Sequence, residues 1–372
     1  MAIETIQKGK KYKIVITISN INGNKKRHCE TVYGGKREAE SREREIKRQL
    51  EKKTFVKRNQ ITVSDFFDDW LEYSKERWSP KTYYANICWV KNIKKVIGNI
   101  YLQQLDVKTL ENFYKYLRTK TNLSKTTIRH HYTIITTALN KAVLWGYIAT
   151  NPNNKIEKPK GSKKEINCYC PSEALHLLEV IKGEPLKYQA LIQLAIDSGA
   201  RRSEITGLTW DDIDFDTGYI TINKCTQYTK LEGIYEKEPK SATSNRTFKL
   251  CDSTIKILRK YRKEQLENKL RLGTKWKNSK RVFTTLEGAD MHPDTPSKIL
   301  EKIIRKYNLK RITFHGLRHT AISLQIANGI QPQIISRRAG HSNISITHSI
   351  YSHFFNEEFD SVADTINNFL NA

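Results

Sequence analysis

The spacing of apolar residues changes along this chain from every second position to every third or fourth, and this change limits what the chain can fold into. Near the N-terminus four apolar residues alternate with polar ones, as in a strand with one buried face: Tyr12, Ile14, Ile16 and Ile18. From Thr62 onward the spacing is helical. Because one hydrophobic core rarely serves 372 residues, we expect two or three domains of different architecture.

The first part, residues 1–58, is predicted to be a small basic sheet with one helix. A turn at 20–24 separates the first strand from a second over 25–32, and a charged helix follows over about 36–53. Lys11 and Lys13 alternate with the apolar residues, so they belong to the open face of the sheet. Strands with a basic face suit insertion into a DNA groove, although a basic surface without groove contact is also possible.

The second part, residues 61–152, is predicted to be a four-helix bundle. Thr62 is a good N-cap for the first helix, and Ser79 before a proline begins the second, which ends at Gly98. A third helix lies near 110–117, and a fourth begins at Ser124. The fourth helix begins with a basic cluster that is either a phosphate contact or a solvated face: Lys125, Arg129, His130 and His131.

A linker rich in proline and lysine, 153–165, is expected to join this bundle to the largest part, 166–355. We predict that this part is mainly helical with a small antiparallel sheet, whose strands lie at 219–228, 233–240 and 247–250. The predicted helices lie near 172–182, 188–198, 253–268, 296–306, 316–327 and 332–338. A last helix over 356–372 has one apolar face, which docks either on its own domain or on a neighbouring protomer. The fold class is multidomain α+β.

Charge points to a nucleic-acid partner. The formal net charge is +26, from 65 Lys and Arg against 39 Asp and Glu, and such a field attracts polyanions. The six cysteines show neither zinc spacing nor a disulfide framework, so we expect free thiols in a reducing cytoplasm. We expect no signal peptide and no membrane-spanning segment.

The second half of the chain carries side chains that can hold and cleave a phosphodiester without a metal or cofactor. Arginine binds two phosphate oxygens in a fixed fork, lysine supplies a proton, and tyrosine is a nucleophile that can be joined to phosphorus. His315 and Arg318 are three residues apart, so they share one helix face, and Glu204 is placed to orient Arg201. The candidate catalytic residues are Arg201, Lys240, His315, Arg318, His341 and Tyr351.

Three further interpretations concern the residues around this set. Arg202 and His319 are expected to be structural, His319 facing the core. The lysine is the least certain member, because nearby lysines also qualify: Lys224, Lys230, Lys237 and Lys249.

Four segments around these residues, 198–204, 240–247, 315–320 and 340–353, resemble the active-site boxes of tyrosine recombinases, most of all phage and conjugative-transposon integrases. That family usually has Thr where this chain has Ser198 and Leu where it has Ala339. The resemblance implies an arm-site DNA-binding domain over 1–58, a core-site DNA-binding domain over 61–152 and a catalytic domain over 166–355.

The resemblance also implies a reaction and its partners. Tyr351 would attack a DNA phosphate to give a 3′-phosphotyrosyl link, with strands exchanged through a Holliday junction and no ATP. The two arginines would neutralise the phosphate, His315 would accept a proton or bind the phosphate, His341 would donate a hydrogen bond, and Lys240 would protonate the leaving oxygen. The implied partners are attachment sites in double-stranded DNA, three further protomers in a homotetramer, an excisionase and a DNA-bending host factor.

Three other functions remain open from the residues. A type IB topoisomerase would use the same nucleophile, and a non-catalytic DNA-binding regulator would leave the phosphate ligands unexplained. A metal-dependent transposase would need carboxylates, for which the one obvious cluster is Asp211, Asp212, Asp214 and Asp216. Part of this cluster resembles a calcium loop, but Thr217 and Asn223 replace its glycine and its closing glutamate. We therefore interpret it as a polar turn.

Overall fold

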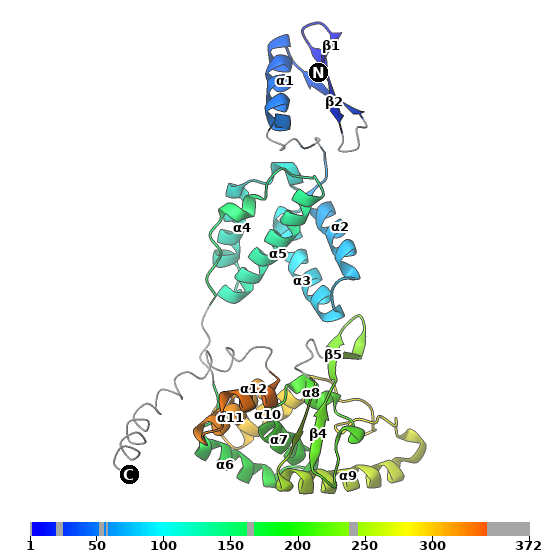
Figure 1. Cartoon of the computed structure of the whole chain (residues 1–372), viewed down its shortest axis with the longest axis vertical. Helices are drawn as coiled ribbons and strands as arrows, with labels where there is room; N and C mark the ends of the chain where they lie inside the picture. Colours follow the sequence, from blue (N-terminus) through cyan, green and yellow to red (C-terminus); the bar gives the residue numbers. More distant parts are fainter. Residues whose placement is uncertain are drawn as a thin grey trace, which may run out of the picture. The chain divides into compact units, whose positions relative to one another are not determined.

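The computed structural model describes residues 2–19, 25–51, 56, 59–161, 167–237 and 245–340. The chain forms two compact units, 1–162 and 163–372. Helices dominate both units, with small antiparallel sheets (Figure 1), so the multidomain α+β prediction is confirmed. No helix within the described ranges is long and apolar enough to cross a membrane. All six cysteines are free, as predicted.

The N-terminal sheet has three antiparallel strands in the order β1-β2-β3, and α1 covers one of its faces. Tyr12, Ile14 and Ile16 are buried, as their alternation predicts, and Ile14 and Ile16 form a small core with Ile46 of α1. β1 was missed because its sequence, AIETIQ, lacks a run of apolar alternation. The elements are β1 Ala2–Gln7, β2 Lys11–Ser19, β3 Lys25–Tyr33 and α1 Lys36–Glu51. The predicted turn at 20–24 lies outside the described residues.

The four-helix bundle follows, with its own apolar core. Three of its four helices begin at a predicted cap: the side chains of Thr62, Ser79 and Ser124 accept hydrogen bonds from the backbone of the first turn. These contacts satisfy N–H groups that have no partner inside a helix. The helices are α2 Val63–Lys75, α3 Pro80–Ile97, α4 Val107–Lys120 and α5 Lys125–Leu144.

The linker begins later than predicted. Residues 152–155 form a 3-10 turn packed on α4 and α5. Asn153 is completely buried, accepts a hydrogen bond from the Tyr114 hydroxyl at 2.7 Å and donates to Thr136 Oγ1 at 2.7 Å. The polar composition suggested a solvated tether, but buried amides with complete hydrogen bonding can belong to a core. The bundle therefore extends at least to Ile156, where a backbone bond to Asn153 closes the turn.

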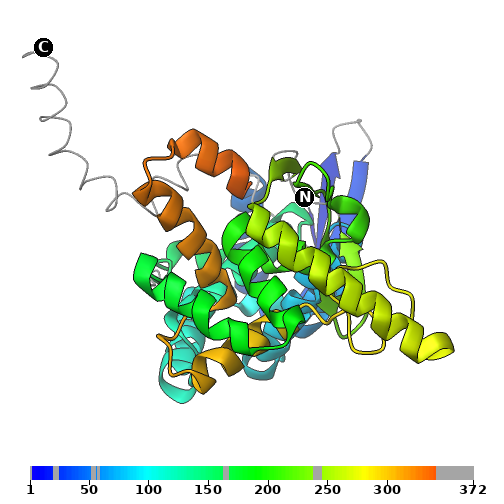
Figure 2. The ribbon, with the colours of Figure 1, turned by 90° about the horizontal axis from the view of Figure 1, so that it is seen from below.

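The second unit is built around α7, which packs against both α9 and α11 (Figure 2). Its apolar core contains residues from most of its helices and from β4. α12 lies on α11 through a separate cluster of Ile322, Ile326, Ile335 and Ala339. The helices are α6 Pro171–Val180, α7 Leu186–Ser198, α8 Arg202–Gly207, α9 Asp252–Leu272, α10 Thr295–Lys306, α11 Phe314–Ala327 and α12 Pro332–Ala339.

The predicted single sheet is in fact two two-stranded ladders, β4 with β7 and β5 with β6. The segment 219–228, predicted as one strand, breaks after Ile222 because Lys224 turns toward Thr209 and Asp212. β5 then runs against α8, where a Cβ on Gly207 would lie 3.0 Å from the α-carbon of Cys225. The strands are β4 Tyr219–Ile222, β5 Cys225–Thr229, β6 Gly233–Lys237 and β7 Arg246–Lys249. The predicted helix over 356–372 lies outside the described residues.

Candidate active site

Arg201 lies in the short connection between α7 and α8. Gly199 ends α7 in the left-handed conformation, with φ at 59°, which glycine adopts without steric cost. Arg201 is the N-cap of α8, and its side chain is 37% exposed. Its Nη1 donates to Glu204 Oε1 at 2.7 Å, and its backbone N–H donates to Oε2 at 2.9 Å. The prediction that Glu204 orients Arg201 is confirmed. Arg202 instead pairs with Asp294, the N-cap of α10, as its predicted structural role requires.

Glu204 is a buried carboxylate that binds two arginines. Its side chain is 4% exposed, and Oε2 also accepts from Arg246 Nη2 of β7 at 2.8 Å. Burial alone would raise the pKa of Glu204, but the charge and hydrogen bond of Arg246, together with those of Arg201, lower it. Glu204 therefore stays ionised, and it fixes two guanidinium groups in one place.

Arg318 approaches the same place from α11. It is 3% exposed, and its Nη1 donates to the carbonyls of Gly199 and Ala339, each at 2.8 Å. Arg201 Nη2 donates to the next carbonyl, that of Gly340, at 2.8 Å. The two arginines singled out from the sequence thus meet at the end of α12, although they are separated by more than a hundred residues.

His315 lies one turn before Arg318 on α11 and is exposed. Its pKa is lowered by the partial removal of the ring from water and by the positive charges of Arg318 and Arg201. The ring is therefore neutral at pH 7 and able to accept a proton. The structure brings His315, Arg318 and Arg201 together, as predicted.

His319 was expected to face the core, and the structure buries it only in part. It is half-buried, with its ring centroid 4.7 Å from that of His315 in an edge-to-face arrangement. Burial, with the charges of His315 and Arg318, lowers the pKa of His319 to about 4. The neutral ring of His319 supports one side of His315.

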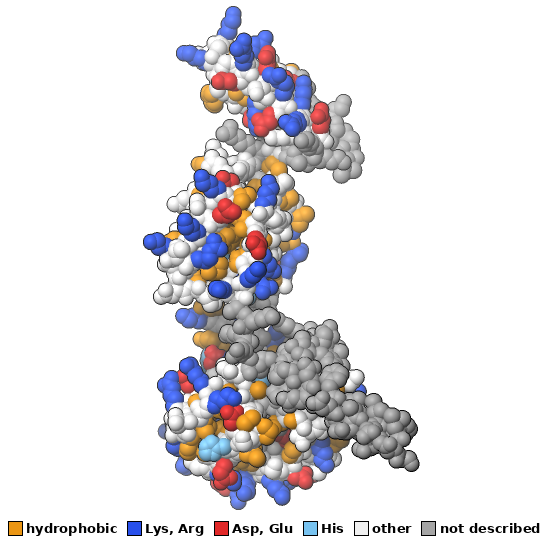
Figure 3. Space-filling model, turned by 90° about the vertical axis from the view of Figure 1, so that its left-hand side faces the viewer, with side chains coloured by type: hydrophobic (Ala, Val, Ile, Leu, Met, Phe, Trp, Pro, Cys, Tyr) orange, Lys and Arg blue, Asp and Glu red, His pale blue; other side chains and the backbone are white. Residues whose placement is uncertain are grey.

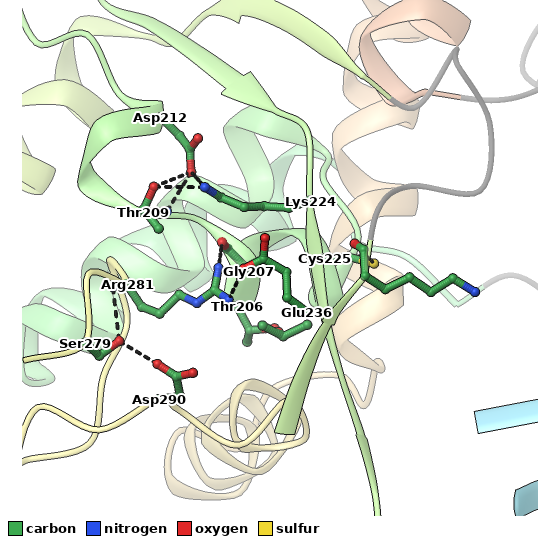
Figure 4. A network of polar contacts seen from close by, with 12 residues as sticks. Thr206, Gly207, Thr209, Asp212, Lys224, Cys225, Glu236, Ser279, Arg281 and Asp290 are labelled. Atoms are coloured by element: carbon green, nitrogen blue, oxygen red, sulfur yellow. Dashed lines mark hydrogen bonds and ion pairs between the residues drawn. The ribbon is translucent and has the colours of Figure 1, made fainter. Parts of the chain in front are cut away.

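Lys240, His341 and Tyr351 lie outside the described residues. The described chain nevertheless reaches Lys237 and Gly340, close in sequence to two of them. Among the alternative lysines, Lys224 contacts Asp212 Oδ2 and Thr209 Oγ1, each at 3.2 Å (Figure 4). This pairing holds Lys224 in the turn before β5 and makes it a poor candidate for proton transfer.

A buried arginine anchors the hairpin of β5 and β6, which leads to Lys240. Arg281 is 7% exposed and donates from Nη1 to the carbonyl of Gly207 at the end of α8 and from Nη2 to Glu236 Oε2 of β6 (Figure 4). The distance from Arg281 Nη2 to Glu236 Oε2 is 2.7 Å. Its loop is held in turn by Ser279, which donates to Asp290 at 2.5 Å. The base of the hairpin is thus tied to the helix that Arg201 caps.

The acidic cluster is a polar turn, as interpreted from the sequence. Asp212 accepts from the backbone and hydroxyl of Thr209, and Asp214 accepts from the backbone of Asp216 and Thr217. Within the described residues no group of three or more His, Cys, Asp or Glu side chains is placed to hold a metal ion.

Two family models match the chain. The model of the phage integrase family matches residues 170–358, just over half of the chain, and that of the phage integrase SAM-like domain matches 62–156. The chain belongs to the phage integrase family. It is a tyrosine recombinase of the integrase type, and its function is site-specific DNA recombination.

Related proteins match the integrase over nearly all of its length. A XerC-like tyrosine recombinase of Caldanaerobacter subterraneus is 28% identical over 97% of both chains. The ICEBs1 integrase of Bacillus subtilis is 24% identical over 91% of this chain and 92% of its own.

Two solved structures show that the fold is shared. That of the Tn1549 transposon integrase with a circular intermediate DNA has a TM-score of 0.69 at 19% identity and covers 83% of this chain and 99% of its own. A lambda integrase dimer bound to a core site has a TM-score of 0.61 at 16% identity and covers 92% of both chains.

Of the residues predicted to bind DNA, four have side chains at the surface of the integrase. Lys125 and Arg129 are exposed on the first turns of α5. Lys11 and Lys13 are half-buried on the face of β2 that points away from α1. Lys13 Nζ lies 3.6 Å from Glu4 Oε2. Lys and Arg side chains are present on each part of the integrase that Figure 3 shows in colour.

His131 is not a DNA contact, so that prediction is wrong. Its side chain is completely buried, with its ring centroid 5.0 Å from that of Trp89. Its Nδ1 is 3.0 Å from the carbonyl of Thr127, one turn earlier, whereas Nε2 has no hydrogen-bond partner. His131 points inward although Arg129 points outward, because successive helix residues are rotated by about 100° and two residues therefore lie on nearly opposite faces.

Two rings beside the predicted cations, those of Trp89 and Tyr33, were missed, whereas His130 belongs to the predicted basic turn of α5. His130 of α5 is exposed and stacks on Trp89 of α3, with ring centroids 5.8 Å apart. Tyr33 at the end of β3 is 76% exposed, with Lys11 Nζ 5.2 Å from its ring centroid. An aromatic residue beside exposed cations is the signal that sequence reasoning left unused.

Proposed function

We propose that this integrase recombines double-stranded DNA through a covalent link between Tyr351 and a 3′ phosphate. The observation that carries the proposal is the convergence of Arg201 and Arg318 on the last carbonyls of α12, directly before His341 in the sequence. His315 adds a neutral ring beside these two cations. Two fixed guanidinium groups are suited to the charge that develops on a phosphorane.

In the cleavage step the tyrosine oxygen forms a bond to phosphorus while the bond from phosphorus to the 5′ oxygen breaks. The Tyr351 proton goes to the neutral His315, and Lys240 protonates the 5′ oxygen as it leaves. Arg201 and Arg318 balance the charge on the non-bridging oxygens, and His341 donates a further hydrogen bond. Attack by the 5′ hydroxyl of a partner strand reverses the step, so no ATP is needed.

DNA recognition is assigned to the two N-terminal domains. We propose that the sheet over 1–58 binds arm sites through Lys11 and Lys13, and that the bundle binds core sites through Lys125 and Arg129. His130 and Trp89 replace His131 in this proposal, because His130 is exposed among the predicted cations and stacks on the half-buried Trp89. Solved complexes of related integrases with DNA support a DNA partner.

The assembly and its place follow from the same proposal. Two DNA duplexes with two cleavable strands each call for four active sites, hence a homotetramer, and an excisionase with a DNA-bending factor would set the direction. The enzyme would work on the bacterial nucleoid in the cytoplasm.

The decisive experiment traps the covalent intermediate on DNA carrying a nick next to the cleavage site. Wild type should form an adduct whose digestion yields one peptide modified at Tyr351, with or without EDTA. Tyr351→Phe should bind the same DNA and form no adduct. An adduct at any other residue, or cleavage that needs a metal, refutes the proposal.

Two further measurements test the substrate. Binding should weaken steeply between 50 mM and 200 mM salt, since lysine contacts to phosphate release counterions. Relaxation of any supercoiled plasmid without pairing of two defined sites would favour a topoisomerase instead.

A further inference from the structure

Three successive carbonyls at the end of α12 accept hydrogen bonds from three arginines. Arg246 Nε donates to the carbonyl of Arg338 at 2.7 Å, Arg318 Nη1 to that of Ala339 at 2.8 Å, and Arg201 Nη2 to that of Gly340 at 2.8 Å. The last carbonyls of a helix have no partner within it and carry partial negative charge. Guanidinium groups therefore stabilise this helix end.

Arg246 differs from the other two arginines. Arg201 and Arg318 are proposed phosphate ligands, whereas Arg246 lies on β7 and its side chain is 7% exposed. Besides the Arg338 carbonyl it contacts Glu204, the carboxylate that also orients Arg201. Arg246 thus links the support of one phosphate ligand to the backbone that leads into His341.

Gly340 shows how closely Arg246 fits this helix end. The residue is in the left-handed region, with φ at +69°, and a Cβ on it would lie 2.8 Å from Arg246 Nη1. The guanidinium could make room only by giving up its bonds to Glu204 or to the Arg338 carbonyl.

A purely structural link between α12 and the rest of the domain already exists beside this one. The side chain of Arg338 stacks on Phe248, 4.4 Å from the ring centroid, and donates to Asp197 Oδ1 and to the carbonyl of Lys249. The apolar cluster between α11 and α12 adds to it. Neither contact reaches Arg201 or Glu204, so the contacts of Arg246 are not needed merely to hold α12 in place.

We propose that Arg246 is a positioning residue for the recombination reaction: it fixes the peptide before His341 relative to Arg201. This inference rests on the proposed roles of Arg201 and His341 at the scissile phosphate. It assigns a role to an arginine that the proposed chemistry does not use.

The test is a double-mutant cycle in the full-length protein, with two readouts. One is the rate of covalent cleavage of nicked DNA at saturating protein, and the other is the dissociation constant for the same DNA. Arg246→Ala should slow cleavage by up to about 100-fold, the cost of misplacing a reacting group by about 1 Å, while the dissociation constant stays within about 3-fold. In a His341→Ala background the same substitution should slow cleavage by no more than about 2-fold, because the group that it misplaces is already gone.

Arg338→Ala is the matched control, since it removes another guanidinium at the helix end that Arg246 contacts. Its effect on cleavage should be the same with and without His341→Ala. If Arg246→Ala behaves in this additive way, or weakens DNA binding in parallel with cleavage, the inference is wrong.

Folding and the proposed function are tested separately. Should Arg246→Ala fail to fold, Arg246→Lys takes its place in the cycle, because it keeps the charge without the planar guanidinium. In a folded Arg246→Ala protein, whose side chain leaves room for it, added guanidinium should restore part of the cleavage only when His341 is present. A wild-type protein that forms no adduct at Tyr351 would refute the proposed function itself, whatever the cycle shows.

Discussion

The guanidinium of Arg246 occupies the space beside the α-carbon of Gly340. A Cβ at residue 340 would lie 2.8 Å from Nη1 and 3.1 Å from Cζ of Arg246. Two requirements therefore meet at this glycine, a left-handed backbone and an empty side-chain position. They can be separated experimentally, because Gly329, after α11, has the same φ of +69° with nothing within 4 Å of its Cβ position.

Gly340→Ala should lower the cleavage rate, whereas Gly329→Ala should leave it almost unchanged. Both substitutions incur the cost of a left-handed alanine, about 1–2 kcal/mol, but only the first displaces Arg246. The measurement is the adduct yield over time on nicked DNA, with melting temperatures to compare the stability cost. Equal cleavage rates in the two variants would show that backbone strain alone matters at residue 340.

Glu236→Ala should slow cleavage by about 3-fold to 10-fold, a modest effect because the ion pair with Arg281 is partly exposed. The substitution frees the β6 end of the hairpin that leads to Lys240, and it keeps the bond from Arg281 to Gly207. The defect should disappear on DNA with sulfur in place of the leaving 5′ oxygen, because a thiolate leaves without a proton.

Lys240→Ala serves as the positive reference for that rescue, and Glu232→Ala, an exposed carboxylate at the turn of the same hairpin, is the charge-matched control. A Glu236→Ala defect that persists on the sulfur-containing DNA would place the role of the hairpin outside proton transfer.

Local signals in the sequence predicted most of the elements. Thr62, Ser79 and Ser124 each begin a helix as expected, since a capping side chain acts within one turn of its own position. The apolar alternation of β2 likewise survives in the structure, with Ile14 and Ile16 buried. The break between β4 and β5 was not predictable, because it depends on the ion pair that Lys224 forms with Asp212, twelve residues earlier in the chain.

The sequence predicted which residues come together in the active site, but it did not predict the hydrogen bonds and ion pairs that hold them. Arg201, His315 and Arg318 meet as the motifs suggested, but nothing local indicates that Arg246 shares the carboxylate of Glu204. The bond between Arg246 and Glu204 joins residues 42 positions apart. It forms only when the tertiary fold brings the start of β7 next to α8. The same limit explains the error over His131, whose basic neighbours masked an inward-facing position.

Asn153→Ala should destabilise the helical bundle by about 1–3 kcal/mol, since it leaves the buried Tyr114 hydroxyl without its acceptor and removes the bond to Thr136 Oγ1. Asn112→Ala, an exposed position on α4, should change the stability by no more than about 0.5 kcal/mol. The measurement is urea unfolding followed by tryptophan fluorescence, because most tryptophans belong to this bundle. Equal urea midpoints for the two variants would show that residues 153–156 belong to the linker and not to the bundle.

His131 should make the bundle sensitive to acid. Burial lowers the pKa of its ring, and Nε2 has no partner that could hold a proton. The unfolded chain, with a histidine pKa near 6.5, then binds more protons than the folded one. The free energy of unfolding is therefore largest above about pH 6.5 and falls as the pH drops below it, by at most about 1.4 kcal/mol per pH unit for one proton.

His131→Phe should remove this pH dependence, while His176→Phe, at an exposed position of α6, should keep it. Unfolding midpoints of the bundle between pH 5 and pH 8 measure the effect; a His131→Phe profile parallel to that of wild type would show that another group titrates.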